Sequence, residues 1–288
     1  RSKVFAKTDA GPDGIAVDAL GNVYTANSRA NTVTKVTASG KASRLGPTGK
    51  TPRGIAVDSS GNVYTSNLGD NTVTKITPGG SSSVLGTTGS KPIDVAVDAA
   101  GNVYTTNYAD STVTKITPGG VSSVHAATGS RPLGITLDRQ GNVYTANEGA
   151  NNVTKITPGG AASTLGKTGS WPQAIAIDRS GNIYTANWNS RNVSKITPKG
   201  SSAIYGKTGR RPIGIAVDPH GAVFTTNDGA NSVSKINRKG RSKVIASTGR
   251  RPIGIASDAA GFLYTANFLS NTITEIYPSP KGPPSVLT

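Results

Sequence analysis

Apolar and polar positions recur along this chain at a fixed spacing of 40 residues. Each copy begins with a proline, continues through a short apolar run that ends in aspartate, and then enters a second apolar run after a glycine. A third run with threonine and valine in alternation follows it. A fixed period of this length is typical of a propeller, a solenoid or a repeat array. The prolines that mark the copies are Pro12, Pro52, Pro92, Pro132, Pro172, Pro212 and Pro252.

Each copy contains four short runs of β-branched and aromatic residues, which predicts four strands. In the first copy the runs cover residues 15–18, 23–27, 32–37 and 43–46. Glycine-containing turns separate the first run from the second and the third from the fourth, which favours antiparallel hairpins. No segment keeps a helical apolar period, so we expect essentially no helix. Seven such units predict an all-β fold, a seven-bladed β-propeller that occupies residues 1–288 as one domain.

The two ends of the chain offer competing strands for the seventh blade. Val4-Phe5-Ala6 lies 40 residues before Arg44-Leu45-Gly46, so residues 1–8 form a fourth strand without the other three strands of its copy. The tail, residues 279–288, contains Ser285-Val286-Leu287, which also resembles a fourth strand but is displaced by two residues. We therefore expect the N-terminal strand to join the last blade and close the ring.

Composition excludes several kinds of chemistry. The chain has 288 residues and a formal net charge of +16, with no cysteine, no methionine and two histidines. There is thus no disulfide framework, no thiol nucleophile and no cysteine-ligated metal, and a multi-histidine metal centre is nearly excluded. No apolar run approaches the length of a membrane-spanning helix, so we expect no transmembrane segment. The absence of cysteine and methionine suits a secreted or cell-surface protein, and we expect a monomer.

The repeated phrases resemble those of a known group of propellers. Residues 12–27 follow the pattern PxGIAVDxxGNVYTAN, and residues 71–80 read NTVTKITPGG. Both are similar to NHL-repeat propellers, and more closely to the virginiamycin B lyase-like propellers of bacteria. The resemblance covers the whole chain, and it implies the fold more strongly than an activity because the shared motifs are structural.

The lyase in that group is a magnesium-dependent enzyme that opens a cyclic peptide antibiotic by elimination, with histidine and glutamate residues on one face. In this chain His125 falls on an outer strand and His220 in a turn, while Glu148 lies in a loop and Glu275 replaces a lysine of the third strand. None of these matches the lyase set. We therefore expect no catalytic residue, no metal and no cofactor, and keep a lyase activity as the alternative.

Three polar sets repeat in the copies and are expected to be structural. An aspartate ends the first strand and accepts hydrogen bonds from the following turn, and a lysine on the third strand covers apolar surface with its stem. An asparagine ends the second strand and satisfies the next turn, with a ring of amides around the central funnel as the alternative. These asparagines are Asn27, Asn67, Asn107, Asn147, Asn187, Asn227 and Asn267.

The loops that vary between copies are better candidates for binding. In a propeller the loops before the first strand and after the second share one face, and here they carry arginine beside aromatic residues, the usual composition of a binding face. Arginine suits phosphate, carboxylate or sulfate groups. A second basic cluster, residues 238–243, falls on the opposite face. The candidate ligand-binding residues are Tyr108, Arg131, Trp171, Trp188, Arg210, Arg211, Arg250, Arg251 and Phe268.

These observations favour a non-catalytic binding module whose partner is anionic or polymeric: a polyanion such as nucleic acid or an acidic glycan, a phospholipid surface, an acidic protein, or a peptide. Sparse aromatics weaken sequence-specific reading of single strands. Two further classes stay open. One is the lyase-like enzyme, and the other is a structural scaffold or assembly subunit whose basic surface serves solubility.

Overall fold

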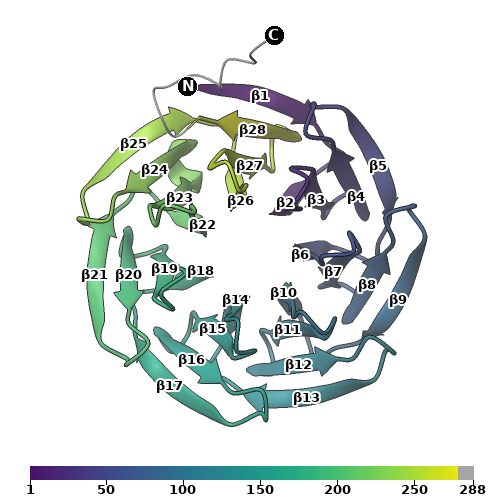
Figure 1. Ribbon diagram of the computed structural model, residues 1–288, viewed down its shortest axis with the longest axis horizontal. Coiled ribbons are helices and arrows are strands. Elements are labelled where there is room, and N and C mark those ends of the chain that lie inside the picture. The colour runs from purple at the N-terminus through teal and green to yellow at the C-terminus, as the bar shows by residue number, and fades with distance from the viewer. Residues whose placement is uncertain (278–288) are drawn as a thin grey trace.

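The computed structural model describes residues 1–277, which form seven four-stranded antiparallel sheets around a central axis (Figure 1). This confirms the seven-bladed propeller expected from the repeat. The blades, with strands given from the axis outward, are: blade 1, β2 (Pro12–Val17), β3 (Val23–Asn27), β4 (Thr32–Val36), β5 (Ala42–Pro47); blade 2, β6 (Pro52–Val57), β7 (Val63–Asn67), β8 (Thr72–Ile76), β9 (Ser82–Thr87); blade 3, β10 (Pro92–Val97), β11 (Val103–Asn107), β12 (Thr112–Ile116), β13 (Ser122–Ala127); blade 4, β14 (Pro132–Leu137), β15 (Val143–Asn147), β16 (Asn152–Ile156), β17 (Ala162–Lys167); blade 5, β18 (Pro172–Ile177), β19 (Ile183–Asn187), β20 (Asn192–Ile196), β21 (Ser202–Lys207); blade 6, β22 (Pro212–Val217), β23 (Val223–Asn227), β24 (Ser232–Ile236), β25 (Ser242–Ser247); and blade 7, β26 (Pro252–Ser257), β27 (Leu263–Asn267), β28 (Thr272–Ile276), β1 (Ser2–Lys7).

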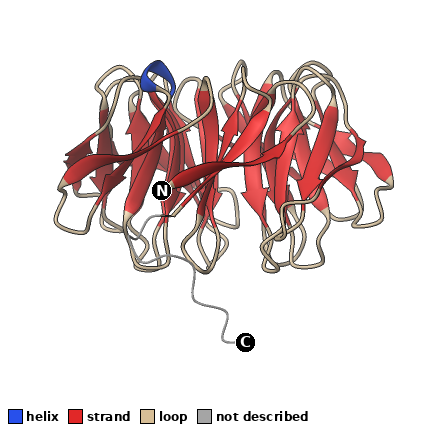
Figure 2. Ribbon diagram, turned by 90° about the horizontal axis from the view of Figure 1, so that it is seen from above, coloured by secondary structure: helices blue, strands red, loops and turns tan. Residues whose placement is uncertain are grey.

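Two faces of the disc are distinguished by their loops. The loops that enter each innermost strand and the loops between the second and third strands lie on one face, which we call the top face. It is the upper side of Figure 2 and carries η1 (Asp228–Ala230), a single turn of 3-10 helix. The turns between the first and second strands and between the third and fourth form the bottom face. Apart from η1, no helix occurs in residues 1–277, and none there could cross a membrane.

The N-terminal strand closes the ring, as the register of the repeat predicted. β1 pairs antiparallel with β28, with Lys3 opposite Glu275 and Val4 opposite Thr274. It takes the place that β5 takes beside β4 in the first blade. The competing strand, residues 285–287, lies outside the described residues.

One detail of the strands differs from the sequence-based expectation. The innermost strand of blade 1 begins at Pro12, three residues earlier than expected, because Pro12 pairs with Asn27 beyond an irregularity in the register. The expected tight turns are confirmed. Gly21 has φ 79°, and Asp18 Oδ1 accepts the Leu20 and Asn22 N–H groups at 2.9 and 2.8 Å, which holds the turn closed.

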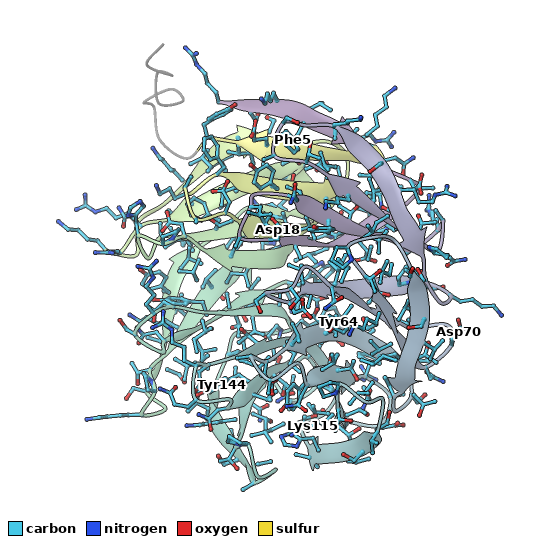
Figure 3. All side chains as sticks on the ribbon, turned by 45° about the vertical axis from the view of Figure 1, so that its right-hand side comes forward. Phe5, Asp18, Tyr64, Asp70, Lys115 and Tyr144 are labelled. Atoms are coloured by element: carbon cyan, nitrogen blue, oxygen red, sulfur yellow. The ribbon has the colours of Figure 1, made fainter. Side chains whose placement is uncertain are left out.

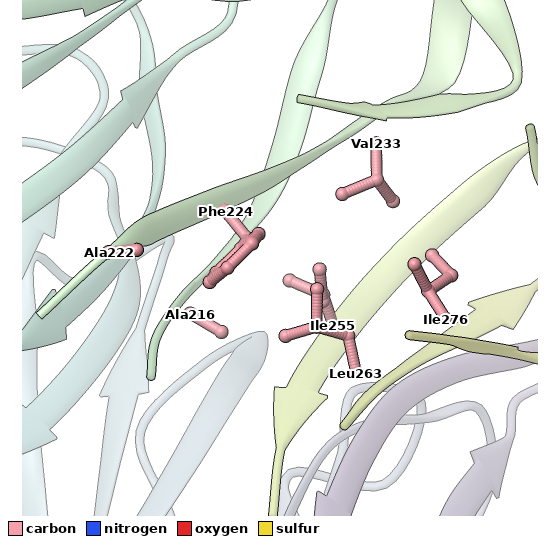
Figure 4. Packing of buried hydrophobic residues seen from close by; sticks show 7 residues of the cluster. All are labelled: Ala216, Ala222, Phe224, Val233, Ile255, Leu263 and Ile276. Atoms are coloured by element: carbon pink, nitrogen blue, oxygen red, sulfur yellow. The ribbon is translucent and has the colours of Figure 1, made fainter. Parts of the chain in front are cut away.

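The core is divided into seven clusters, one at each contact between neighbouring blades. Between blades 6 and 7, Phe224 and Val233 meet Ile255 and Leu263, together with Ala216, Ala222 and Ile276 (Figure 4). The second and third strands are the most buried because a neighbouring blade covers each of their faces. Consecutive apolar residues in those strands fit such a two-sided environment.

Candidate functional site

The top-face loops hold two residues of each blade in a left-handed backbone conformation, one directly before the third strand and one directly before the repeat proline. Arg251 shows the contacts that fix the residue before the proline. Its N–H donates to Asn231 Oδ1 of the preceding blade at 2.8 Å, and its carbonyl oxygen accepts from Phe268 N at 2.9 Å. A left-handed conformation costs a residue other than glycine about 1–2 kcal/mol. Blade 1 uses Gly11 here, whereas the other six use Thr51, Lys91, Arg131, Trp171, Arg211 and Arg251, with φ from 54° to 59°.

Both tryptophans of the chain meet on this face. Trp171 precedes β18 and Trp188 follows β19, and Trp188 N donates to Trp171 O at 2.9 Å. Their rings stack with centroids 5.3 Å apart and an interplanar angle of 23°. Trp171 is 47% exposed, so the stack presents an open aromatic surface. Arg211 of blade 6 extends the row, with its guanidinium carbon 5.2 Å from the Trp188 ring centroid.

A second aromatic–arginine group continues the row over blade 7. Phe268 is nearly buried because two arginines cover it, with guanidinium carbons 4.8 Å (Arg251) and 4.6 Å (Arg29) from the ring centroid. Arg251 Nε also lies 3.8 Å from Asp228 Oδ1 of blade 6. Cation–π contacts of this kind hold arginine side chains in place while they remain charged.

Three of the predicted arginines line one groove between blades 6 and 7. The groove has a volume of about 400 Å³ and is bounded by Arg211, Arg250, Arg251, Asp228 and Leu269. We call it the arginine groove. Its only carboxylate is that of Asp228, so the charge excess in it is positive. Arg210 precedes Arg211 in the same loop but does not line the groove.

The remaining candidates lie on the other side of the top face. The Tyr108 ring has the Arg131 guanidinium carbon 5.9 Å from its centroid, and its hydroxyl donates to Glu148 Oε2 at 3.2 Å. Glu148 Oε1 accepts from Gln173 Nε2 at 3.3 Å. The structure therefore divides the predicted residues into two groups rather than one site. Trp171, Trp188, Arg211, Arg250, Arg251 and Phe268 form the first, and Tyr108 and Arg131 belong to the second.

A polar cluster at the top end of the central channel was missed by the sequence analysis. Asp13, Arg53, Asp94 and Gln173 lie at the start of the innermost strands and line a cavity of about 130 Å³. Arg53 Nε is 2.8 Å from Asp13 Oδ2. The equivalent positions in the other blades hold Ile, Leu, Gly or Ala, which complete the channel wall. A polar residue at an otherwise apolar position of the repeat was the signal that could have revealed them.

The two channel carboxylates are held by different partners. Burial raises the pKa of Asp94 to about 6, against the hydrogen bonds that its oxygens accept from the Ile135 and Val95 N–H groups. Burial also raises the pKa of Asp13, and the charges of Arg53 and Arg251 oppose that rise. Arg251 thus acts electrostatically on the channel as well as on the groove.

The seven asparagines do not surround the channel. They are fully buried on the second strand, and their side chains bond to hydroxyls within their own blade and, in blades 4 and 5, also to the side-chain oxygen of Asn152 or Asn192. Asn27 Nδ2 donates to Thr32 Oγ1 at 3.1 Å and Thr34 Oγ1 at 2.9 Å, and Asn27 Oδ1 accepts from Thr25 Oγ1 at 3.0 Å. The expected bonds from these side chains to the following turn are therefore replaced by bonds between strands. The alternative ring of amides in the funnel is wrong because the second strand is shielded from the axis by the first.

The repeated aspartate and lysine are structural. Asp18 Oδ2 accepts from Asn22 Nδ2 and Tyr24 Oη at 2.8 and 2.9 Å, and Lys35 Nζ lies 5.6 Å from the Tyr24 ring centroid. Figure 3 labels four members of this repeated set on four different blades, Asp18, Tyr64, Lys115 and Tyr144.

The described residues do not fit a catalytic magnesium site. No group of three or more His, Asp or Glu side chains gathers anywhere in residues 1–277. His125 lies on β13 with its ring 5.3 Å from the Tyr104 ring, and His220 lies in a bottom-face turn. In the channel, Asp13 is paired with Arg53 and both Asp94 oxygens accept backbone N–H groups.

Comparison with known proteins agrees with the fold. The model of the Virginiamycin B lyase family matches residues 41–281. Virginiamycin B lyase from Staphylococcus aureus superposes with a TM-score of 0.82 at 17% identity, over 96% of this chain and 97% of that chain. A catalytically inactive form of that lyase with quinupristin gives 0.83 at 19% identity, over 96% and 97%.

An unrelated activity occurs on the same architecture. Hydrazine synthase from Kuenenia stuttgartiensis superposes with a TM-score of 0.81 at 19% identity, over 96% of this chain and 98% of that chain. Comparison with curated proteins finds no match. At these identities the structural likeness establishes the fold and no shared activity.

Proposed function

The chain belongs to the virginiamycin B lyase family, and from that premise we propose that it is a non-catalytic member, a binding propeller whose top face holds an anionic, ring-bearing chain. The binding surface is the row formed by the Trp171–Trp188 stack, the arginine groove and Phe268. The partner is a polyanion, an acidic glycan or an acidic peptide. Such a role fits a secreted or cell-surface monomer, which stays part of the proposal.

One observation carries this proposal: bulky side chains occupy strained backbone positions where glycine would cost less. Gly11 shows that the architecture accepts glycine there, yet Trp171, Arg211 and Arg251 keep left-handed backbones. Residues held in strained backbone conformations cluster at ligand-binding and active sites. Trp171 has both backbone contacts described for Arg251, with Asn151 Oδ1 of the preceding blade as the acceptor of its N–H. Arg211 has the second contact, since its carbonyl oxygen accepts from Asp228 N at 3.0 Å.

The chemistry of the row indicates the kind of ligand. Arg211, Arg250 and Arg251 supply guanidinium groups, which bind carboxylate, phosphate or sulfate in a bidentate manner. The Trp171–Trp188 stack beside them offers a flat apolar surface for a sugar, a base or an aromatic side chain. An anionic chain with a ring in each unit would satisfy both.

The two tryptophans make the test direct, because the chain has no others. Tryptophan fluorescence would be titrated with heparin, an acidic polysaccharide, and single- and double-stranded nucleic acid at several salt concentrations. We expect a fluorescence change with one class of polymer that persists at physiological salt. Arg211→Gly and Arg251→Gly should each weaken binding about tenfold or more.

Lys91→Gly is the matched control, since it removes one charge from the same left-handed position on the other side of the face. Two outcomes would contradict the proposal: equal loss of binding in all three variants, or binding that disappears at physiological salt for every polymer. Either would mean that the net charge of +16 serves solubility and not specific binding. The protein would then be better described as a structural scaffold.

Family membership favours a second candidate, a lyase acting on a cyclic peptide. The test is incubation with quinupristin in the presence of Mg²⁺, followed by mass spectrometry for the opened peptide. We expect none, because residues 1–277 contain no cluster of three metal-ligating side chains. Turnover abolished by a chelator would replace the binding proposal with an enzymatic one.

A further inference from the structure

The bottom face carries two large cavities that the proposed function does not use. Each is a groove between neighbouring blades. The groove between blades 4 and 5 has a volume of about 640 Å³, and the groove between blades 5 and 6 about 440 Å³. They adjoin because Arg179, in the bottom-face turn of blade 5, lines both.

The free charges in these grooves are positive. Two of the three carboxylates that line them are saturated, whereas the third, Asp218, accepts only the His220 and Ala222 N–H groups on Oδ1. Asp138 accepts the Gln140 and Asn142 N–H groups on Oδ1, and Asn142 Nδ2 and Tyr144 Oη on Oδ2. Asp178 accepts the equivalent set of bonds. Within the described part of the chain the cations have no carboxylate partner, and Lys155 and Lys195 lie over the Tyr144 and Tyr184 rings. The ion pairs found among residues 1–277 include none of Arg139, Lys155, Arg179, Lys195 and Arg238.

The arginines of these grooves are confined to one sector of a seven-fold molecule, whereas the lysine of the third strand recurs in six blades. Arg139 and Arg179 occupy a position that is Ala, Ser or Pro in every other blade. Arg238, whose Nε donates to the His220 carbonyl oxygen, stands where most blades have proline. The same groove between blades 7 and 1 is lined by Leu20, Phe262 and Glu275 and by no lysine or arginine. That groove lacks the repeat lysine because Glu275 replaces it, so the arginines are what set the grooves of blades 4 to 6 apart from the repeat.

We propose that the bottom face of blades 4 to 6 is a second polyanion-binding surface, which binds the carboxylate or sulfate groups of an acidic polysaccharide. The lining favours a polysaccharide over nucleic acid. Asn142, Gln140 and Ser180 offer hydrogen bonds to hydroxyl groups, whereas Tyr144 and Tyr184 are buried. The third tyrosine, Tyr205, is half-buried against the Tyr184 ring with Lys195 over its own ring, so little aromatic surface is left to stack with a base.

A disc with anion-binding surfaces on opposite faces would bridge two chains. Arg139 and Arg179 lie on the bottom, and Arg211 and Arg251 on the top, so one polysaccharide segment cannot contact both sets without passing over the rim. Long chains would then be cross-linked by the protein, with avidity that neither face has alone.

The experiment uses the full chain and variants that borrow residues from its own repeats. The bottom variant carries Arg139→Ala and Arg179→Ser, residues found at the same position in blades 1 to 3. The control carries Lys41→Ser and Lys167→Thr, which also remove two charges and also follow other blades. The top variant carries Arg211→Gly and Arg251→Gly. Calorimetry with short heparin and polygalacturonate fragments gives affinity and stoichiometry, and light scattering with long chains gives cross-linking.

We expect the top variant to retain one class of binding site. Adding Arg139→Ala and Arg179→Ser to the top variant should lower the affinity of that site at least tenfold. Scattering should fall to the background in either face variant and persist in the control. Which polymer binds the top variant distinguishes sulfate from carboxylate recognition. If the top variant binds neither polymer at physiological salt, if the bottom and control variants behave alike, or if only nucleic acid binds, the second surface is refuted. Loss of top-face binding alone would refute only the proposed function.

Discussion

At the scale of single residues, this chain repeatedly uses a backbone conformation that its side chains disfavour. The architecture imposes the left-handed region on the residue before each repeat proline, and sequence variation then decides what the position costs. Thr51 is the most informative case, because its β-branched side chain is poorly suited to φ 54° and makes no hydrogen bond within the described residues. A substitution at Thr51 therefore measures the cost of the left-handed backbone without the loss of an arginine or a tryptophan side chain.

Thr51→Gly should raise the free energy of unfolding by about 1 kcal/mol, because glycine adopts this conformation without steric penalty. Urea unfolding of the variant beside the wild type measures the change. Thr72→Gly, on a regular strand, is the control and should destabilise. A lower urea midpoint for Thr51→Gly than for the wild type would show that the left-handed backbone at this position costs threonine little.

Asp94 gives a pH dependence with a definite sign. Its pKa is about 6 in the folded chain, above the ordinary value of 3.8, because burial disfavours the charged form in the channel beside Asp13 and Arg53. The folded state therefore holds the proton more tightly between about pH 4 and 6, and stability contributed by this group falls as pH rises through that window.

Asp94→Gly, which restores the residue of most other blades, should gain stability relative to the wild type as pH rises from 4 to 7. The pH-dependent part of that gain is about 1 to 3 kcal/mol. Paired urea titrations at the two pH values measure it. The same difference at both would mean that Asp94 titrates normally.

At the scale of strands and turns, the blades serve as controls for one another, and this explains what the sequence could predict. The fixed period of the repeat predicted the number of strands, the positions of the turn glycines and the identity of the closing strand, because each of these depends only on spacing along the sequence. The channel cluster escaped because Asp13 and Arg53 fall within the apolar phrase of the innermost strand, where side-chain direction decides what faces the axis. The asparagines were misplaced for a related reason. Their position along the strand was correct, but the order of strands from the axis makes them core residues.

The Asp-Asn-Tyr network offers a matched pair of substitutions. Tyr144→Phe removes the hydroxyl that donates to Asp138 and should cost about 1 kcal/mol. Blade 6 already has Phe224 and Ala222, so Asp218 lacks both side-chain donors. Phe224→Tyr should therefore stabilise by a similar amount. Thermal midpoints of both variants decide the matter, and two midpoints that fall together would show that packing around the ring outweighs the hydrogen bond.

At the scale of the whole molecule, stability depends on a single non-covalent seam. β1 and β28 are the only described pair of blade strands that come from opposite ends of the chain. There the repeat lysine is replaced by Glu275, whose Oε2 lies 2.8 Å from Lys3 Nζ and accepts from Tyr277 Oη at 3.0 Å. In the other blades the lysine faces a neutral residue, as Lys35 faces Ser43, or in blade 6 another lysine. The replacement of the repeat lysine by glutamate therefore favours β1, which carries Lys3, as the strand that pairs with β28.

Glu275→Lys should weaken the seam by about 1 to 3 kcal/mol, because it places two cations opposite each other on neighbouring strands and leaves Lys3 without its carboxylate. Adding Lys3→Ser should recover most of the loss, since the pair then matches Lys35 and Ser43 and the new lysine can lie over Tyr264 as Lys35 lies over Tyr24. Thermal midpoints give the stabilities, and amide hydrogen exchange of residues 2–7 shows whether the strand detaches before the ring unfolds. Rapid exchange there in Glu275→Lys, with protection restored in the double variant, would establish that charge selects the closing strand. A double variant as unstable as the single one would instead assign the closure to backbone pairing and to the packing of Phe5 against Tyr264, whose rings lie 5.2 Å apart.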